Sequence, residues 1–143
     1  MTDCLDVKPA QQWTDAERQG VALLIVNPLT NGGMASDVTA EQVAAQFPPN
    51  TPAWGVWVEE RPVFVVGLWP FDGVRGCLHL AGDRTLNHQQ HVSLVRAFLS
   101  CMDGVDVFST TSSPALVRLA RQVGLSVTGQ VTTYALGRAN PEQ

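Results

Sequence analysis

Apolar positions in the first fifty residues recur with the spacing of helices. Thr14 precedes Glu17 by three residues, which is the pattern of a capping box, and an apolar stripe follows until Pro28 ends the run. The pattern returns in a shorter form over 39–47. The sequence therefore predicts a short strand at 5–7 followed by two helices. The stripe of the first helix comprises Val21, Leu24 and Ile25.

The apolar period then changes to two, which is the spacing of strands. The segments 53–58 and 62–69 are rich in Val, Trp and Phe and flank a polar turn, so they predict a β-hairpin. A third strand is predicted over 74–80. Its two faces carry Arg75, Cys77 and His79 on one side and Gly76, Leu78 and Leu80 on the other.

The second half of the chain alternates helices and short strands. A long helix is predicted over 87–102, a strand over 105–108 and two final strands over 125–129 and 131–137. Between these strands, a serine followed by a proline starts a helix over 113–124. The apolar stripe of the long helix comprises Leu94, Val95, Phe98, Cys101 and Met102. That of the later helix comprises Leu116, Leu119, Ala120 and Val123.

These elements fit one domain over residues 1–143, which is long enough to bury a core. Their order is β-α-α-β-β-β-α-β-α-β-β, with no internal repeat. We expect an α/β (α+β) fold in which a mixed, mostly antiparallel sheet is flanked by helices.

Charged residues are scarce, at 15% against a usual share of about 25%. The nine basic residues are scattered and form no stripe, which argues against nucleic acid, and no apolar run is long enough for a membrane span. We therefore expect a protein partner or self-assembly to cover part of a charge-poor surface. Trp54 and Trp57 lie an odd number of positions apart, so they face opposite sides, and we expect one of them in an exposed apolar patch.

The three cysteines, at positions 4, 77 and 101, form no CxxC pair. The N-terminal residues are polar and acidic, whereas a signal peptide needs a basic start and an apolar run. The sequence therefore predicts a protein of a reducing, cytoplasmic compartment that no signal peptide exports.

Four segments resemble the GCN5-related N-acetyltransferase superfamily. Residues 5–10 are similar to its opening strand, 54–58 and 62–68 to its central hairpin, and 113–124 to its fourth-helix motif. The resemblance covers nearly the whole chain, and it implies the acetyltransferase fold. It also implies that acetyl-CoA is the cofactor if the protein is active.

The sequence departs from this superfamily at the cofactor loop, where the family places an Arg/Gln-x-x-Gly-x-Gly/Ala motif whose backbone N–H groups hold a pyrophosphate. Residues 82–90 contain one glycine, and the carboxylate of Asp83 would repel phosphate. We therefore expect no firmly bound cofactor. The positions that would contact acetyl-CoA are Leu78, Leu80, Gly82, Arg84 and Ser113.

Two residues are candidates for proton transfer. His79 has the ordinary pKa of a general base, although a strand histidine can also be structural. The family tyrosine that protonates the departing thiolate corresponds to Ala120, which leaves Tyr134 as the single tyrosine of the chain. Glu59 and Glu60 are expected in a solvated turn.

One cysteine and three histidines are candidate ligands of a metal ion. Two of the histidines, at positions i and i+3, share a predicted helix face, but the spacing of the group matches no zinc pattern. We therefore expect no metal. The group comprises Cys77, His79, His88 and His91.

The chain further resembles short phage-encoded members of the superfamily, including virion proteins, in its size, its tryptophan-rich hairpin and its lack of the glycine loop. This resemblance implies a structural or accessory component of a phage particle, with little or no catalysis, made in the host cytoplasm and incorporated into the virion. The alternative is an active N-acetyltransferase that acts on a small amine or a protein amino group.

Overall fold

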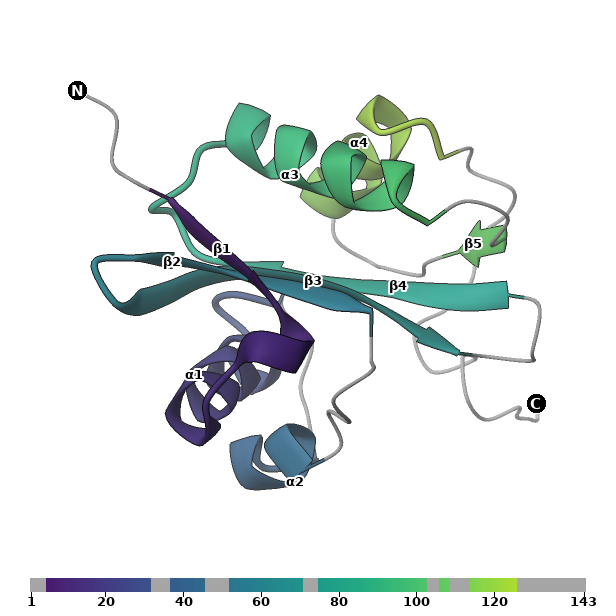
Figure 1. The fold of residues 1–143 in the computed structure, drawn as a ribbon. Helices are drawn as coiled ribbons and strands as arrows, with labels where there is room; N and C mark the ends of the chain where they lie inside the picture. Colours follow the sequence, from purple (N-terminus) through teal and green to yellow (C-terminus); the bar gives the residue numbers. More distant parts are fainter. Residues whose placement is uncertain are drawn as a thin grey trace.

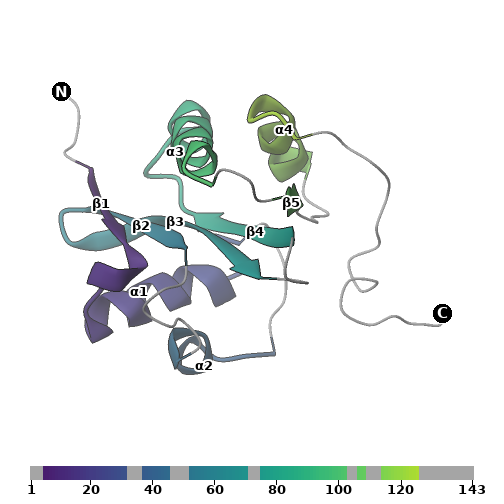
Figure 2. The same ribbon diagram turned by 45° about the vertical axis from the view of Figure 1, so that its right-hand side comes forward.

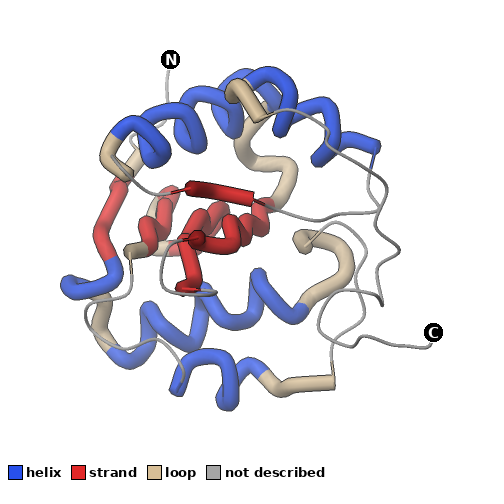
Figure 3. The backbone as a smooth tube through the Cα atoms, turned by 90° about the vertical axis from the view of Figure 1, so that its right-hand side faces the viewer, coloured by secondary structure: helices blue, strands red, loops and turns tan. Residues whose placement is uncertain are grey.

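The structure, a computed structural model, describes residues 5–31, 37–45, 52–70, 75–102, 106–108 and 114–125. A five-stranded sheet lies between two layers of helices (Figure 1; Figure 3). The strand order is β1-β2-β3-β4-β5, with antiparallel pairs up to β4 and a parallel pair between β4 and β5. The strands are β1 (Asp6–Pro9), β2 (Ala53–Val58), β3 (Arg61–Pro70), β4 (Arg75–Gly82) and β5 (Asp106–Phe108).

Helices cover both faces of the sheet. The short helix η1 (Ala10–Gln12) leads into α1 (Asp15–Val26), which covers one face with α2 (Ala40–Ala45). The opposite face is covered by α3 (His88–Ser100) and α4 (Pro114–Gln122) (Figure 2). The expected mixed, mostly antiparallel α/β architecture is therefore confirmed. None of the helices in these described ranges is long and apolar enough to cross a membrane.

The helix starts agree with the sequence pattern. Thr14 accepts a hydrogen bond from the backbone N–H of Glu17, and the Glu17 carboxylate accepts one from the backbone N–H of Thr14, so the predicted capping box is confirmed. Helix α1 is also tied to β1 by Lys8, whose Nζ lies 2.5 Å from Glu17 Oε2 and 5.4 Å from the centre of the Trp57 ring. These contacts hold α1 against the outer strand of the sheet.

Two apolar clusters fill the space between the sheet and the helices, and strand alternation divides the tryptophans between them. Trp57 lies on the α1/α2 side and is 3% exposed, whereas Trp54 lies on the α3/α4 side and is half-buried, 5.4 Å from the Phe98 ring. The opposite orientation of Trp54 and Trp57 is confirmed. Trp54 is therefore the tryptophan nearer the surface, although it is not among the exposed large apolar side chains of the described ranges, which are Val7, Leu23, Leu29 and Val38.

The predicted apolar stripes need correction at their ends. Helix α3 ends at Ser100, so Cys101 is exposed rather than buried. Within α4 only Leu119 is fully buried, because α4 lies at the β5 end of the sheet and covers the margin of the core. The other members of that predicted stripe, Leu116, Ala120 and Val123, are half-buried. The predicted strands 125–129 and 131–137 fall almost wholly outside the described residues.

The hairpin between β2 and β3 closes with a two-residue turn at Glu59 and Glu60. Both residues have positive φ, at 50° and 68°, a conformation usually taken by Asn or Gly in such turns. Both side chains are exposed, as expected for a solvated turn.

The α1/α2 face of the sheet contains the same short motif twice, a glycine followed two residues later by a tryptophan. A Cβ atom added to Gly55 would lie 2.6 Å from the Trp57 ring, and one added to Gly67 would lie 2.6 Å from the Trp69 ring. Each tryptophan therefore folds back over the glycine of its own strand, which has no side chain to exclude it. The two tryptophans differ in burial, since Trp57 is buried and packs against Trp13, whereas Trp69 is half-buried.

We predict that Gly55→Ala is more destabilising than Gly67→Ala. Trp57 is almost fully buried, so the added methyl should cost about 2–3 kcal/mol of the free energy of unfolding, whereas the half-buried Trp69 should limit the loss to about 1 kcal/mol. Urea unfolding of the two variants and the wild type measures this difference. Equal losses would contradict the difference in cover between the two tryptophans.

Candidate functional site

Among the described residues, β4 and β5 pair at three positions. The pairs begin at Arg75 with Asp106 and end at Cys77 with Phe108, while β4 continues to Gly82. No other described strand pairs with β4 on this edge. The part of β4 beyond these pairs leads to the start of α3 (Figure 2).

The backbone direction at this edge follows from one hydrogen bond. The N–H of Gly82 donates to the carbonyl of Thr30, at 2.8 Å, rather than to β3. Because the direction of N–H groups alternates along a strand, those of Leu78 and Leu80 point to the same edge. The structure therefore brings three predicted cofactor positions, Leu78, Leu80 and Gly82, to one line, with the α1–α2 connection closing its end at Gly82.

The loop after β4 is held by hydrogen bonds within the protein. Five of the nine backbone N–H groups from residue 82 to residue 90 already donate to protein acceptors. The N–H of Gly82 donates to the carbonyl of Thr30, and that of Asp83 donates to the carbonyl of Val63. The N–H of Thr85 donates to the Asp83 carboxylate. The N–H groups of Asn87 and Gln90 each donate to the side-chain oxygen of the other residue. Most of the donors that a pyrophosphate would need at this loop are therefore engaged.

Asp83 is the centre of this loop. Its carboxylate lies 2.6 Å from Arg61 of the hairpin and accepts a 2.8 Å hydrogen bond from the N–H of Thr85, while Arg61 also donates to the Thr85 hydroxyl at 2.6 Å. Partial burial alone would raise the pKa of Asp83, but the hydrogen bonds from Thr85 and Arg61 outweigh it and lower the pKa. The loop thus carries a negative charge, partly balanced by Arg61, next to the exposed Arg84.

His79 lies just beyond the described pairs of β4 and β5. It is the second residue after the last β4–β5 pair, it faces the α1/α2 side, and its register partner on β3 is Gly67. The Trp69 ring meets the His79 ring edge to face, with 5.0 Å between centroids and 79° between planes. The residue is exposed, yet desolvation by neighbouring atoms lowers the pKa of His79. Its imidazole is therefore neutral near pH 7 and able to accept a proton.

The candidate metal ligands lie on opposite faces of the sheet. Cys77 is on the His79 side of β4 and is buried, which raises the pKa of its thiol, whereas His88 and His91 belong to α3 on the other side. Among the residues that the structure describes, no three His, Cys, Asp or Glu side chains are grouped as metal ligands would be.

Sequence reasoning missed a histidine contact at the start of α3. The His91 ring stacks on Phe64 at 5.1 Å, and its Nε2 has no hydrogen-bond partner among the described residues. Burial, followed by the nearby His88, lowers the pKa of His91. It also missed Thr30 and Arg61, which come from other segments of the chain.

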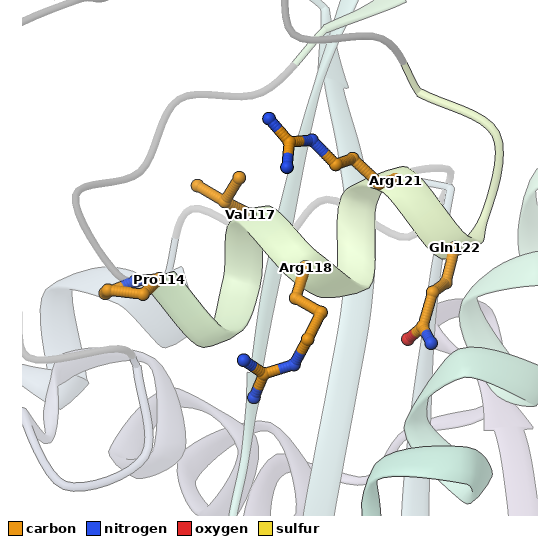
Figure 4. Close-up of a pocket in the computed structure, with 5 residues that line it drawn as sticks. All are labelled: Pro114, Val117, Arg118, Arg121 and Gln122. Atoms are coloured by element: carbon orange, nitrogen blue, oxygen red, sulfur yellow. The ribbon is translucent and has the colours of Figure 1, made fainter.

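A separate hollow of about 490 Å³ lies on the outer face of α4. Its described lining is confined to that helix and includes two arginines (Figure 4). None of the predicted site residues in the described ranges lines it, and Ser113 and Tyr134 lie outside those ranges. The lining residues are Pro114, Val117, Arg118, Arg121 and Gln122.

Comparisons with known proteins give a uniform result at the level of structure. No protein-family description and no curated protein matches the sequence. The fold is similar to that of a GNAT-family acetyltransferase from Streptococcus pneumoniae, with a TM-score of 0.63 and 11% identity over 88% of this chain and 87% of that one.

Two further structures are similar. A probable acetyltransferase from meticillin-resistant Staphylococcus aureus has a TM-score of 0.62 and 18% identity over 87% of this chain and 92% of that one. An aminoglycoside N-acetyltransferase solved with CoA has a TM-score of 0.59 and 8% identity over 92% of this chain and 94% of that one. The protein therefore has the fold of the GCN5-related N-acetyltransferases.

Proposed function

We propose that the protein binds an acyl-CoA thioester along the edge of β4 that follows its three described pairs with β5, and transfers the acyl group to an amine. The position of His79, two residues beyond the last of these pairs, is the observation that carries this proposal. It is supported by the acetyltransferases that share the fold, one of which was solved with CoA.

The residues of β4 fit the pantetheine arm of CoA. That arm contains two amide groups, which can hydrogen-bond to a strand edge as a neighbouring strand would. Leu80 offers its backbone to this edge, and the buried Leu78 and half-buried Leu80 side chains give the arm an apolar border. Acetyl-CoA, when bound, supplies an activated acetyl thioester.

The loop fits the pyrophosphate of CoA less well. Its donors are largely engaged and Asp83 repels an anion, so the exposed Arg84 is the remaining described group of this loop that can pair with a phosphate. Affinity for the cofactor should accordingly come from β4 more than from the loop.

His79 accepts the proton that the attacking amine loses. An imidazole that is neutral at pH 7 can take up this proton without first losing one of its own. Its side chain faces the α1/α2 side, so the amine must approach from that side to come within hydrogen-bond reach.

A second candidate function is a structural or accessory protein, including a component of a phage particle, that works through a protein partner or self-assembly. It is supported by the engaged N–H groups of the loop and by the Asp83–Arg61 pair, which together leave no prepared anion site there. Under this candidate the chain keeps the acetyltransferase fold without its cofactor.

Calorimetric titration with acetyl-CoA separates the two candidates. We predict binding in the ordinary substrate range of about 1 µM to 1 mM. Asp83→Asn should tighten it about fivefold, equivalent to roughly 1 kcal/mol of relieved repulsion. Glu41→Gln removes the same charge from α2 on the opposite side of the sheet and should change nothing. Absence of binding by both the wild type and Asp83→Asn would favour the structural candidate.

The rate of CoA release should depend on the protonation of His79. With aniline as acceptor, whose own pKa is low, we predict that kcat/KM rises with pH through a pKa below about 6.5 and is level above pH 7, because only neutral imidazole accepts the proton. His79→Gln should lower kcat by about 100-fold or more while acetyl-CoA still binds. A variant that retains the wild-type rate would remove His79 from the mechanism.

A further inference from the structure

The ring of His91 fills a narrow space between the start of α3 and the sheet. It stacks on Phe64 of β3, with 5.1 Å between ring centroids and 27° between ring planes. A Cβ atom added to Gly82 of β4 would lie 3.0 Å from His91 Nε2 and 2.8 Å from the Phe64 ring. The imidazole therefore lies against the backbone of β4 at a position where a glycine leaves room for it.

This imidazole is a polar group in apolar surroundings. Its Nε2 atom is buried and has no hydrogen-bond partner among the described residues. The carbonyl of Val63, which lies 3.3 Å from the same added Cβ position, accepts the N–H of Asp83. Two neighbouring side chains that anchor the segment, Leu86 and Val92, are buried and apolar. His91 is thus the titratable member of the contact between this segment and the sheet.

The charges that face His91 come from its own helix and from the loop. A positive charge on His88, one turn earlier in α3, disfavours a charge on His91. The Asp83 carboxylate favours such a charge, but it is already paired with Arg61 of β3. The residues of β3 and β4 that the ring touches carry no charge. Burial is the largest of these effects, and the pKa of His91 is lowered as a result.

We propose that His91 is a pH-sensitive contact: the neutral ring holds the start of α3 and the loop 83–87 on the sheet, and the protonated ring releases them. Protonation makes both ring nitrogens donors and adds a charge. At Nε2 this donor would be buried without an acceptor, so the charged ring is stable once it has left the space between Phe64 and Gly82 and reached water. The inference goes beyond the proposed acyl transfer and does not depend on it.

Release changes the hydrogen bonding of the loop. In the closed form the N–H of Asp83 donates to Val63, at 3.0 Å, and this bond joins the loop to β3 beside the His91 ring. It opens together with the ring, so acid converts a loop whose N–H groups are engaged into one that presents them to solvent. The sign follows from burial: the closed form is fully stable above the ordinary histidine pKa of about 6.5 and is lost as the pH falls below it.

Backbone amide exchange at about pH 7.5 and about pH 5.5 tests the release, with each rate expressed as protection relative to the unfolded chain at the same pH. In the wild type we expect the protection of residues 83–92 to fall about threefold or more beyond any fall in α1. His91→Phe keeps a ring on Phe64 and removes the titrating group, so residues 83–92 should then change no more than α1. His79→Gln removes a histidine from the opposite face and should behave as the wild type.

A second measurement needs no change at His91. The ring proton signals of His91, assigned by comparison with His79→Gln and His88→Gln, should titrate below about pH 6.5, and the loss of amide protection should follow the same curve. Circular dichroism shows whether His91→Phe is folded, and the titration decides if it is not. A His91 ring that titrates at or above about pH 6.5 would overturn the inference. Equal protection of residues 83–92 at both pH values in the wild type, or an undiminished pH effect in His91→Phe, would overturn it as well.

Discussion

The account depends on the backbone groups at one edge of β4. Among the described residues, β5 pairs with this edge at three positions, the last of which joins Cys77 to Phe108. At Gly82 the backbone N–H donates to Thr30 of the α1–α2 connection. Leu80 lies between these two points, and in the proposed function its backbone hydrogen-bonds to the ligand next to His79.

The two faces of the sheet carry different parts of the proposed site. Its α3/α4 side holds the larger apolar cluster, the capped start of α3 and the loop around Asp83. Its α1/α2 side holds His79 and Trp69. A cofactor at the strand edge and an acceptor amine on the α1/α2 side would therefore meet at β4 without competing for the same residues, which a single closed pocket could not provide. The loop contributes least to binding of the cofactor, because most of its backbone N–H groups already donate hydrogen bonds within the protein.

Local patterns in the sequence predicted the elements well, because capping residues and apolar periods act within one or two turns. Thr14 with Glu17 marks the start of α1, and the odd separation of Trp54 and Trp57 fixes their opposite sides. Contacts across distant segments could not be predicted in this way. Arg61 meets Asp83 across 22 positions, a contact that no local motif indicates.

Amide chemical shifts of the protein titrated with acetyl-CoA test the central claim most directly, since each backbone N–H of β4 reports on its own edge. The account predicts that the largest shift changes occur from Leu78 to Gly82 and that the amide of Leu80 is prominent among them. The amide shifts of β1, at the opposite edge of the sheet, should stay unchanged. Changes confined to the hollow on α4 around Arg118 and Arg121, with the amides of β4 unmoved, would contradict it.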